Sequence, residues 1–259
     1  MKLHFYKYQG TGNDFILLDN RKKELQLNSR QIAMLCDRHR GIGADGLMLL
    51  EDKKGYDFHM VYYNADGNES SMCGNGGRCI TAFAQRLGII STHASFTAID
   101  GVHKASINDN DTITLHMSDV NGIDTYTDYC LLNTGSPHYV KWVADVQNAA
   151  VVAEGRAIRH RHDFEPNGIN VNFVQRDGDN LIVRTYERGV EDETLSCGTG
   201  VTASAIAASG AETGYFDTRI QTPGGILEVT FMKNGPASAE QVTLRGAAEF
   251  VFEGDISIS

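Results

Sequence analysis

The stretch SMCGNG at residues 71–76 returns as LSCGTG at residues 195–200, and this recurrence decides the fold. In both copies Cys-Gly-x-Gly is followed by a run of small and apolar residues. A tyrosine precedes each cysteine, Tyr63 by ten residues and Tyr186 by eleven. The shared pattern indicates an internal duplication of the chain.

Two further landmarks keep the same register around the two cysteines. Residues 11–13 (TGN) begin 62 positions before the first cysteine, and residues 134–136 (TGS) begin 63 positions before the second. The dipeptides at residues 100–101 and 224–225 both end 28 positions after their cysteine. Because several landmarks share one offset, the sequence predicts two equivalent domains.

The boundary between the two domains is expected near Met117, because residues 118–128 are polar and rich in turn-forming residues. The predicted division is residues 1–117 with Cys73, residues 118–247 with Cys197, and a C-terminal segment, residues 248–259, that can pack on the first domain.

Each of the two cysteines is expected just before a helix. Apolar residues recur at helical spacing over residues 80–87, and Gly88 can end that helix. The alanine-rich run at residues 201–208 predicts a second helix, with Gly210 as its stop. Strands are predicted at residues 15–18, 46–50 and 112–115. Each half is therefore expected to be an α/β unit of many strands around one helix.

Composition excludes several functional classes. The 259 residues carry 23 basic and 33 acidic side chains, a net charge of −10, which does not suit a nucleic-acid-binding surface. No apolar run approaches the length of a membrane span, and the N-terminus lacks the apolar centre of a signal peptide. We therefore expect a soluble cytoplasmic protein. The five cysteines show no CxxC pair, so reduced thiols are expected at positions 36, 73, 79, 130 and 197.

A cysteine at a helix start is in a chemically special place. The N-terminus of a helix carries unpaired N–H groups and a partial positive charge, which favour a thiolate and can hold an anion. Glycines beside Cys73 and Cys197 remove side chains that would block a ligand. Two such sites can hold a carboxylate and place a sulfur on either side of its α-carbon. One sulfur would then remove the α-proton while the other returns a proton to the opposite face, which is general acid–base catalysis.

Two other interpretations of these features are weaker. A free cysteine is usually a small buried apolar residue, and we expect that role for Cys36, Cys79 and Cys130. The glycine-rich stretches could cradle a phosphate, but none ends in Gly-Lys-Ser/Thr or completes the dinucleotide-binding fingerprint.

The chain resembles the diaminopimelate epimerase family over essentially its whole length. The motifs that carry the resemblance are GTGNDF (residues 10–15), GIGADG (41–46), NADG (64–67), MCGNGGR (72–78), PH (137–138), NVNF (170–173), YERG (186–189) and CGTG (197–200).

The resemblance implies an α/β (α+β) fold of two pseudo-symmetric domains, each a curved, antiparallel-rich sheet wrapped around a central helix. It places the active site in the interdomain cleft, without pyridoxal phosphate and without a metal. The implied reaction interconverts LL- and meso-diaminopimelate, which supplies lysine and cell-wall precursor. We also expect a homodimer that binds its small-molecule substrate but no nucleic acid and no membrane.

The resemblance assigns roles residue by residue. Cys73 and Cys197 resemble the acid/base pair, and Arg188 can make a bidentate pair with a carboxylate. The backbone cradle for the reacting carboxylate corresponds to Gly74, Asn75, Gly198 and Thr199, and the groups that hold the substrate correspond to Asn13, Asn64, Asn170 and Arg188. Glu187 and His138 resemble polar residues beside the reacting centre. A turn role for Asn64 and Asn170, a packed histidine at 138 and a surface ion pair at 187–188 stay open.

Two positions depart from a common pattern of the family. Some members carry glutamine where Gly46 stands and asparagine where Ser136 stands, and both side chains contact substrate in those members. Ser136 can still form a hydrogen bond, whereas Gly46 has no side chain. These departures affect the substrate contacts but not the class of reaction.

Three other protein classes are also compatible with the paired cysteines. A proline or hydroxyproline racemase would share the paired cysteines, but the asparagine side chains favour a substrate with a second charged end. A thiol redox protein would use Cys73 and Cys197 as a reversible disulfide, and would need thiol turnover. A non-catalytic amino-acid-binding protein would tolerate replacement of either cysteine.

Overall fold

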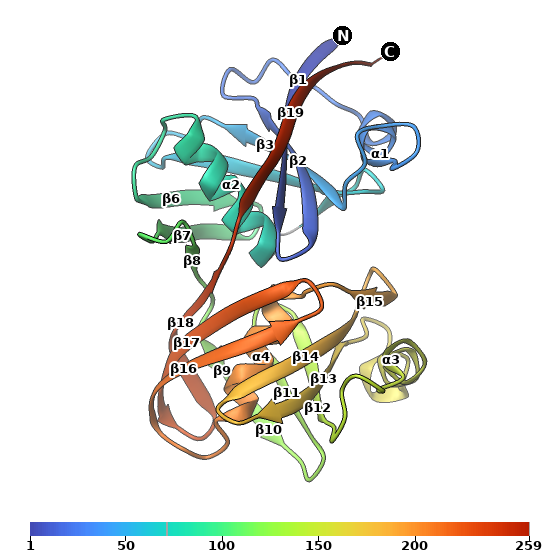
Figure 1. Cartoon of the computed structure of the whole chain (residues 1–259), viewed down its shortest axis with the longest axis vertical. Helices are drawn as coiled ribbons and strands as arrows, with labels where there is room; N and C mark the ends of the chain where they lie inside the picture. Colours follow the sequence, from blue (N-terminus) through green and yellow to red (C-terminus); the bar gives the residue numbers. More distant parts are fainter. Residues whose placement is uncertain (71, 259) are drawn as a thin grey trace. The chain divides into compact units, whose positions relative to one another are not determined.

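The computed structural model describes residues 1–70 and 72–258, so that Ser71 of the first cysteine motif lies outside the described residues. The chain divides into two compact units. Figure 1 shows the chain coloured by residue number. Unit 1 comprises Met1–Leu115 together with Gly246–Ser259, and unit 2 comprises His116–Arg245. In the described part of the chain, no helix is both long and apolar enough to cross a lipid bilayer.

The sheet of unit 1 runs in the order β19–β1–β2–β3–β4–β6–β7–β8. Its strands are β1 (Lys2–Gly10), β2 (Asn13–Asp19), β3 (Gly46–Glu51), β4 (Phe58–Asn64), β6 (His93–Ala98), β7 (Gly101–Ile107), β8 (Ile113–His116) and β19 (Glu249–Ser257). The short β5 (Glu69–Ser70) pairs with β4. The β2–β3 and β4–β6 pairs are parallel and the others antiparallel, so the expected strands at residues 15–18, 46–50 and 112–115 are confirmed within a residue or two.

Helix α2 (Gly74–Arg86) is the central helix of unit 1. It contacts β1, β2, β3 and β7, and its apolar face, with Ile80 and Phe83, is fully buried. The helix ends at Arg86 with Leu87 as its C-terminal cap, and Gly88 adopts a positive φ of 70°, which glycine tolerates at a helix end. Helix α1 (Ser29–Cys36) begins with a capping box between Asn28 and Gln31.

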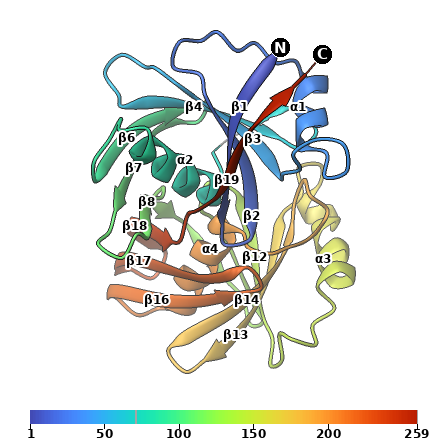
Figure 2. The ribbon, with the colours of Figure 1, turned by 45° about the horizontal axis from the view of Figure 1, so that its top comes forward.

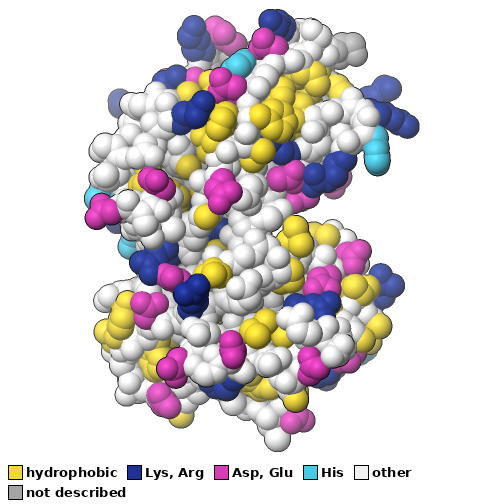
Figure 3. Space-filling model, in the orientation of Figure 1, with side chains coloured by type: hydrophobic (Ala, Val, Ile, Leu, Met, Phe, Trp, Pro, Cys, Tyr) yellow, Lys and Arg dark blue, Asp and Glu magenta, His cyan; other side chains and the backbone are white. Residues whose placement is uncertain are grey.

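The C-terminal strand lies beside the N-terminal strand. Figure 2 shows β19 along β1, and the two pair antiparallel from Lys2 opposite Ser257 to Gln9 opposite Glu249. The outer side of β19 carries exposed aromatic and aliphatic side chains, among them Phe250 and Phe252, and hydrophobic atoms gather over this part of unit 1 in Figure 3. Strand β19 therefore belongs to the sheet of unit 1.

The sheet of unit 2 runs in the order β10–β11–β12–β13–β14–β16–β17, with β15 paired to β14 and β9 paired to β18. Its strands are β9 (Val120–Asn121), β10 (Ile123–Thr125), β11 (Tyr129–Asn133), β12 (Pro137–Trp142), β13 (Asn170–Asp177), β14 (Asn180–Glu187), β15 (Asp192–Thr194), β16 (Gly214–Thr222), β17 (Gly225–Gly235) and β18 (Ser238–Gly246). The β12–β13 and β14–β16 pairs are parallel.

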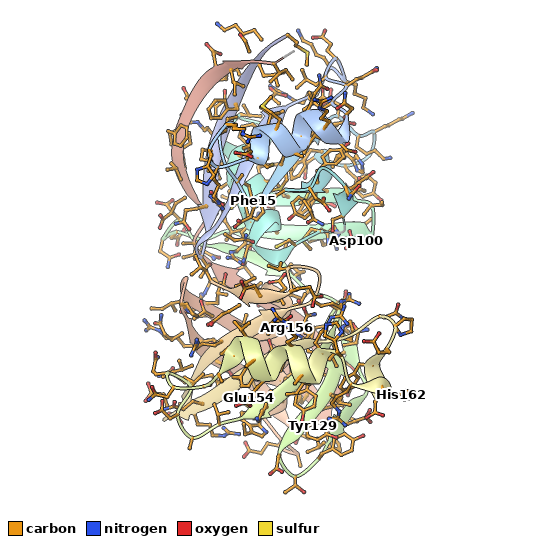
Figure 4. The ribbon with its side chains drawn as sticks, turned by 90° about the vertical axis from the view of Figure 1, so that its right-hand side faces the viewer. Phe15, Asp100, Tyr129, Glu154, Arg156 and His162 are labelled. Carbon is orange, nitrogen blue, oxygen red and sulfur yellow. The ribbon has the colours of Figure 1, made fainter. Side chains whose placement is uncertain are left out.

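Helix α4 (Gly198–Ala208) is the central helix of unit 2. It contacts β11, β12, β13, β14, β16 and β17, and nearly all its side chains are buried. A second helix, α3 (Val151–Arg159), packs on β13 and β14, and Glu154 and Arg156 mark it in Figure 4. A short 3-10 turn, η1 (His162–Phe164), follows it.

The two units repeat one topology. In each, a parallel pair, an antiparallel pair and a second parallel pair follow one another: β2–β3–β4–β6 in unit 1 and β12–β13–β14–β16 in unit 2. A short strand (β5 or β15) and a central helix (α2 or α4) follow the third of these strands in each unit. The predicted fold of two pseudo-symmetric, strand-rich domains, each built around a central helix, is confirmed.

Candidate active site

Both predicted cysteines stand at the same structural position. Cys73 is the residue before the first turn of α2, with φ −95° and ψ 135°, and Cys197 is the residue before the first turn of α4, with φ −121° and ψ 111°. Each carbonyl already accepts the first helical hydrogen bond, from Gly77 at 2.7 Å and from Val201 at 2.9 Å. The sequence-based prediction of a cysteine at each helix start is therefore confirmed, and each sulfur lies at the positive end of a helix dipole.

Asn13 and Asn75 surround Cys73 in unit 1. The side-chain oxygen Oδ1 of Asn13 lies 3.7 Å from Cys73 Sγ and accepts a 3.5 Å hydrogen bond from Asn75 Nδ2. Asn75 is fully buried, and its own Oδ1 accepts from Arg78 at 3.0 Å. The structure thus brings together three residues of the predicted site, Cys73, Asn13 and Asn75.

A network of charged residues supports Asn13. Its Nδ2 donates to Asp45 Oδ2 at 2.5 Å, and Arg38 donates to Asp45 and, through both terminal nitrogens, to Asp14. Lys7, whose side chain is nearly buried, forms an ion pair with Asp14 at 2.7 Å. Burial alone would raise the pKa of Asp14, but the hydrogen bonds from Arg38 and Lys7 outweigh it and lower this pKa to about 2. The Asp14 carboxylate is therefore ionised at neutral pH.

Arg78 places a positive charge inside unit 1 beneath the start of α2. Its side chain is fully buried and donates to neutral oxygens of Thr11, Asn75, Gly74 and Ala247. Burial lowers its pKa. A guanidinium remains charged in proteins, so this residue adds to the positive potential at the helix start and favours a negative charge there.

Ser136, Asn170 and Arg188 form a second cluster in unit 2. Asn170 Nδ2 donates to Ser136 Oγ at 2.8 Å, and Asn170 Oδ1 accepts from the backbone N–H of Arg188 at 2.9 Å. The guanidinium of Arg188 donates to the same Ser136 Oγ at 3.2 Å and to Asn167 O at 3.3 Å. The structure therefore brings these three predicted residues together and fixes Arg188 from both its backbone and its side chain.

His138 lies beneath α4 as a buried neutral imidazole. Its Nδ1 accepts from Asn172 Nδ2 at 3.1 Å, because Asn172 Oδ1 is already the acceptor for Thr185 Oγ1 at 3.0 Å. Burial, with a smaller effect from the charge of Arg188, lowers the pKa of His138 to about 3. The proton of the neutral ring then sits on Nε2, which is buried and has no hydrogen-bond partner within residues 1–70 and 72–258.

The remaining predicted residues of unit 2 lie around the start of α4. Cys197 Sγ is 3.5 Å from Thr199 Oγ1, and the carbonyl of Thr199 accepts from Thr134 Oγ1 at 2.9 Å. Glu187 Oε2 accepts from Thr194 Oγ1 at 2.8 Å.

Asn64 stands at the exposed end of β4 in unit 1.

Comparison with known proteins settles the family. The model of the diaminopimelate epimerase family matches residues 5–123 and 130–251. The chain is 51% identical to the diaminopimelate epimerase of Flavobacterium psychrophilum, over 99% of this chain and 100% of that protein. It is 40% identical to the diaminopimelate epimerase of Chlorobaculum tepidum, over 96% of this chain and 99% of that protein. The chain belongs to the diaminopimelate epimerase family.

Solved structures share the fold of this family member at low sequence identity. A phenazine biosynthesis protein of the PhzF family from Bacillus anthracis matches with a TM-score of 0.77 at 13% identity and covers 100% of both chains. A hydroxyproline epimerase from Agrobacterium vitis matches with a TM-score of 0.72 at 16% identity, over 98% of this chain and 92% of that one. At such identities these likenesses concern the fold alone.

Three residues near the candidate site of this epimerase family member were not singled out from the sequence. Asp45 holds Asn13, Asn172 holds His138, and Tyr62 fills the space beside Gly46. Asp45 and Asn172 stand inside the quoted motifs GIGADG and NVNF, where their polar character was the available signal. Tyr62 stands just before the NADG motif and carried no such signal.

The other cysteines of this family member take the buried role expected for them. Burial raises the pKa of Cys36 and of Cys79 to about 12, and it also raises that of Cys130. Throughout residues 1–70 and 72–258, no three His, Cys, Asp or Glu side chains gather in the manner of a metal-binding group.

Proposed function

We propose that the protein interconverts LL- and meso-2,6-diaminopimelate by inverting one α-carbon, with Cys73 and Cys197 as its acid/base pair and no cofactor. The observation that carries the proposal is the matched placement of the two cysteines at the starts of the central helices in two repeated units. Membership of the diaminopimelate epimerase family supports the choice of substrate.

The chemistry needs three things from these residues. One thiolate removes the α-proton, and the opposite thiol gives a proton to the other face, so both sulfurs must reach one carbon. The developing negative charge on the substrate carboxylate needs fixed donors, which the N–H groups of residues 74–75 and 198–199 supply at the helix starts. The side chains of Asn13, Asn64, Asn170 and Arg188, with Ser136 and Glu187 beside them, then hold the charged groups of the substrate.

His138 takes an auxiliary place in this proposal. Its neutral ring, with the Nε2 proton buried under α4, offers a hydrogen bond without adding a charge. A positively charged histidine would compete with Arg188 for anionic groups of the substrate.

Proton exchange in deuterated water tests the reaction. Purified protein incubated with LL-diaminopimelate should place deuterium at the α-carbon of the meso product before the remaining substrate is labelled. The reason is that one sulfur removes the substrate's own α-proton, while the other sulfur delivers a proton that has exchanged with the deuterated solvent. Label in the remaining substrate at the same initial rate would contradict the two-base mechanism, and exchange only into L-proline would contradict the substrate.

Paired cysteine variants test the roles of the two sulfurs. Cys73→Ser and Cys197→Ser should each lower kcat by at least about a hundredfold, because a general acid or base contributes that much or more. Cys79→Ser in α2 and Cys130→Ser in unit 2 are the matched controls, since both are buried away from a helix start. Activity retained in either of the first two variants would favour a binding protein, and activity abolished by reductant would favour a redox protein.

Cofactor independence is tested on the same assay. Dialysis against a chelator and treatment with a carbonyl-trapping amine should leave the exchange rate unchanged, because the proposal assigns no step to a metal or to pyridoxal phosphate. Loss of exchange that returns on adding back either group would contradict this part of the proposal.

The assembly and the cellular location stay predictions. A homodimer is expected, and the exposed Phe250, Val251 and Phe252 of β19 provide an apolar surface on unit 1. Sedimentation velocity would show a dimer or a monomer directly. Cell fractionation would test the expected cytoplasmic location.

A further inference from the structure

The space beside Gly46 is occupied by Tyr62. A Cβ atom at position 46 would lie 2.5 Å from Cε2 of Tyr62, 3.0 Å from its hydroxyl oxygen and 2.7 Å from the carbonyl of Tyr63. The first and last of these distances are shorter than carbon side chains tolerate, so a side chain at position 46 would meet both the Tyr62 ring and the backbone of Tyr63. The space beside position 46 is thus filled by an aromatic ring that carries a hydroxyl.

Strand register places Tyr62 on the face that carries the candidate site. In the antiparallel β3–β4 pair, Gly46 is opposite Asn64 and Met48 is opposite Tyr62. Opposite residues, and residues two apart along a strand, share a face. Met48 on this face lies 3.2 Å from the Cβ position of Gly76 in the first turn of α2. The face that carries Tyr62 and Asn64 therefore faces the helix that begins after Cys73.

The hydroxyl of Tyr62 lies at the end of the sheet where the substrate-holding residues gather. Asp45, next to Gly46, accepts from Asn13, while Gly46 itself pairs with Asn64. The hydroxyl lies beside Gly46, and so at the end of the strands where Asn13 and Asn64 also stand.

The ring of Tyr62 is held in place. Its edge meets the ring of Phe15, labelled in Figure 4, with centroids 6.1 Å apart, and only 8% of the residue is exposed. A ring fixed in this way orients its hydroxyl with little conformational freedom left to lose on binding.

We propose that Tyr62 is a substrate-binding residue, whose hydroxyl hydrogen-bonds a charged group of the substrate beside Asn13 and Asn64. The hydroxyl both donates and accepts, so it suits a carboxylate or an ammonium group. This inference rests on the proposed function, because it names a contact to the same substrate.

The test is the Tyr62→Phe variant, which removes the hydroxyl and keeps the ring. KM for LL-diaminopimelate should rise about tenfold, the scale of a lost hydrogen bond to a charged group, while kcat stays within about twofold. That split marks loss of binding, since a merely misfolded fraction would lower kcat and leave KM unchanged.

Tyr63→Phe is the matched control, because Tyr63 is the next residue of β4 and faces the opposite side of the sheet. Its KM should equal that of the wild type. A Tyr62→Phe KM within twofold of the wild type, or an equal rise in both variants, would overturn the inference. Absence of exchange in the wild-type protein would instead contradict the proposed function, so the two failures are distinguishable.

Discussion

The side-chain amide of Asn13 donates a 2.5 Å hydrogen bond to Oδ2 of Asp45. The nitrogen is the donating end of an amide side chain, so this contact fixes the orientation of the whole Asn13 amide group. The amide oxygen is left toward Cys73, 3.7 Å from its sulfur. An acceptor in that place binds the protonated form of the thiol.

Replacing Asp45 with asparagine should disturb this arrangement without removing the side chain. The neutral amide of Asp45→Asn can donate as well as accept, so Asn13 loses its fixed orientation and Arg38 loses a charged partner. We expect kcat/KM to fall about tenfold, in line with a hydrogen bond to a charged group. Steady-state exchange kinetics and thermal unfolding on the same sample would measure the effect.

Asp19→Asn is the control for this change. Asp19 lies at the other end of β2 and forms a local ion pair with Arg21 on the surface, where an ion pair contributes little. Its kinetics should match the wild type. Equal kinetics for Asp45→Asn and the wild type would show that Asp45 does not position Asn13 for the reaction.

Gly76 and Gly200 occupy equivalent places in α2 and α4 but have unequal surroundings. A Cβ atom at Gly200 would lie 2.3 Å from Asn172 Oδ1 and 3.3 Å from Cys197 Sγ. Gly200→Ala should therefore displace Cys197 and the partner of His138, and lower kcat/KM by about a hundredfold, because small displacements of reacting groups are costly.

Gly76→Ala should be tolerated. The added methyl would meet the flexible end of Met48, with Cε at 3.2 Å and Sδ at 3.4 Å, and alanine favours the helix by about 1 kcal/mol. We expect kcat/KM within about threefold of the wild type. A comparable loss in both glycine variants would show that local crowding, and not the position of Cys197, governs the effect.

Cys36, Cys79 and Cys130, which lie away from the two helix starts, should be dispensable for the reaction. Burial keeps Cys36 and Cys79, with pKa values of about 12, in the thiol form at pH 8, and Cys130 is also buried with a raised pKa. Replacing each with alanine should cost about 1 kcal/mol of stability and leave exchange within about threefold. Mass spectrometry after brief iodoacetamide treatment at pH 8 should find these three unmodified in the native protein, and rapid labelling of Cys79 would contradict this.

Local sequence signals predicted the parts of the site that depend on a single segment. The glycine-flanked cysteines, the helical spacing after Cys73 and the alanine-rich run after Cys197 each lie within one short segment, and the structure places both helices accordingly. The internal duplication added a further prediction, because a feature recognised in one unit is expected at the equivalent place in the other.

Contacts that join different strands were out of reach of the sequence. Asp45 meets Asn13 only because β2 and β3 pair in parallel with Phe15 beside Gly46, and Tyr62 meets Gly46 only through the register of β3 and β4. A shift of one residue in either register would turn these side chains to the opposite face, and no local pattern specifies that register.

His138 should make the stability of unit 2 depend on pH. Its pKa is about 3 in the folded protein and about 6.5 when unfolded, so the unfolded chain binds the extra proton between these values. The stability is complete above about pH 7 and falls as the pH drops through 6.5. The expected slope is about 1.4 kcal/mol per pH unit, or about 2 kcal/mol lost at pH 5. Carboxylates with lowered pKa values titrate below this window.

Trp142 provides the measurement, because it is the single tryptophan of the chain and lies on β12 with His138. Urea unfolding followed by tryptophan fluorescence should show a falling free energy of unfolding from pH 7.5 to pH 5 in the wild type. His138→Asn cannot gain this proton, so its curve should be flatter by about 2 kcal/mol over that range, whatever its absolute stability. If both proteins lose stability in parallel, His138 is not held neutral and the assigned proton on Nε2 is wrong.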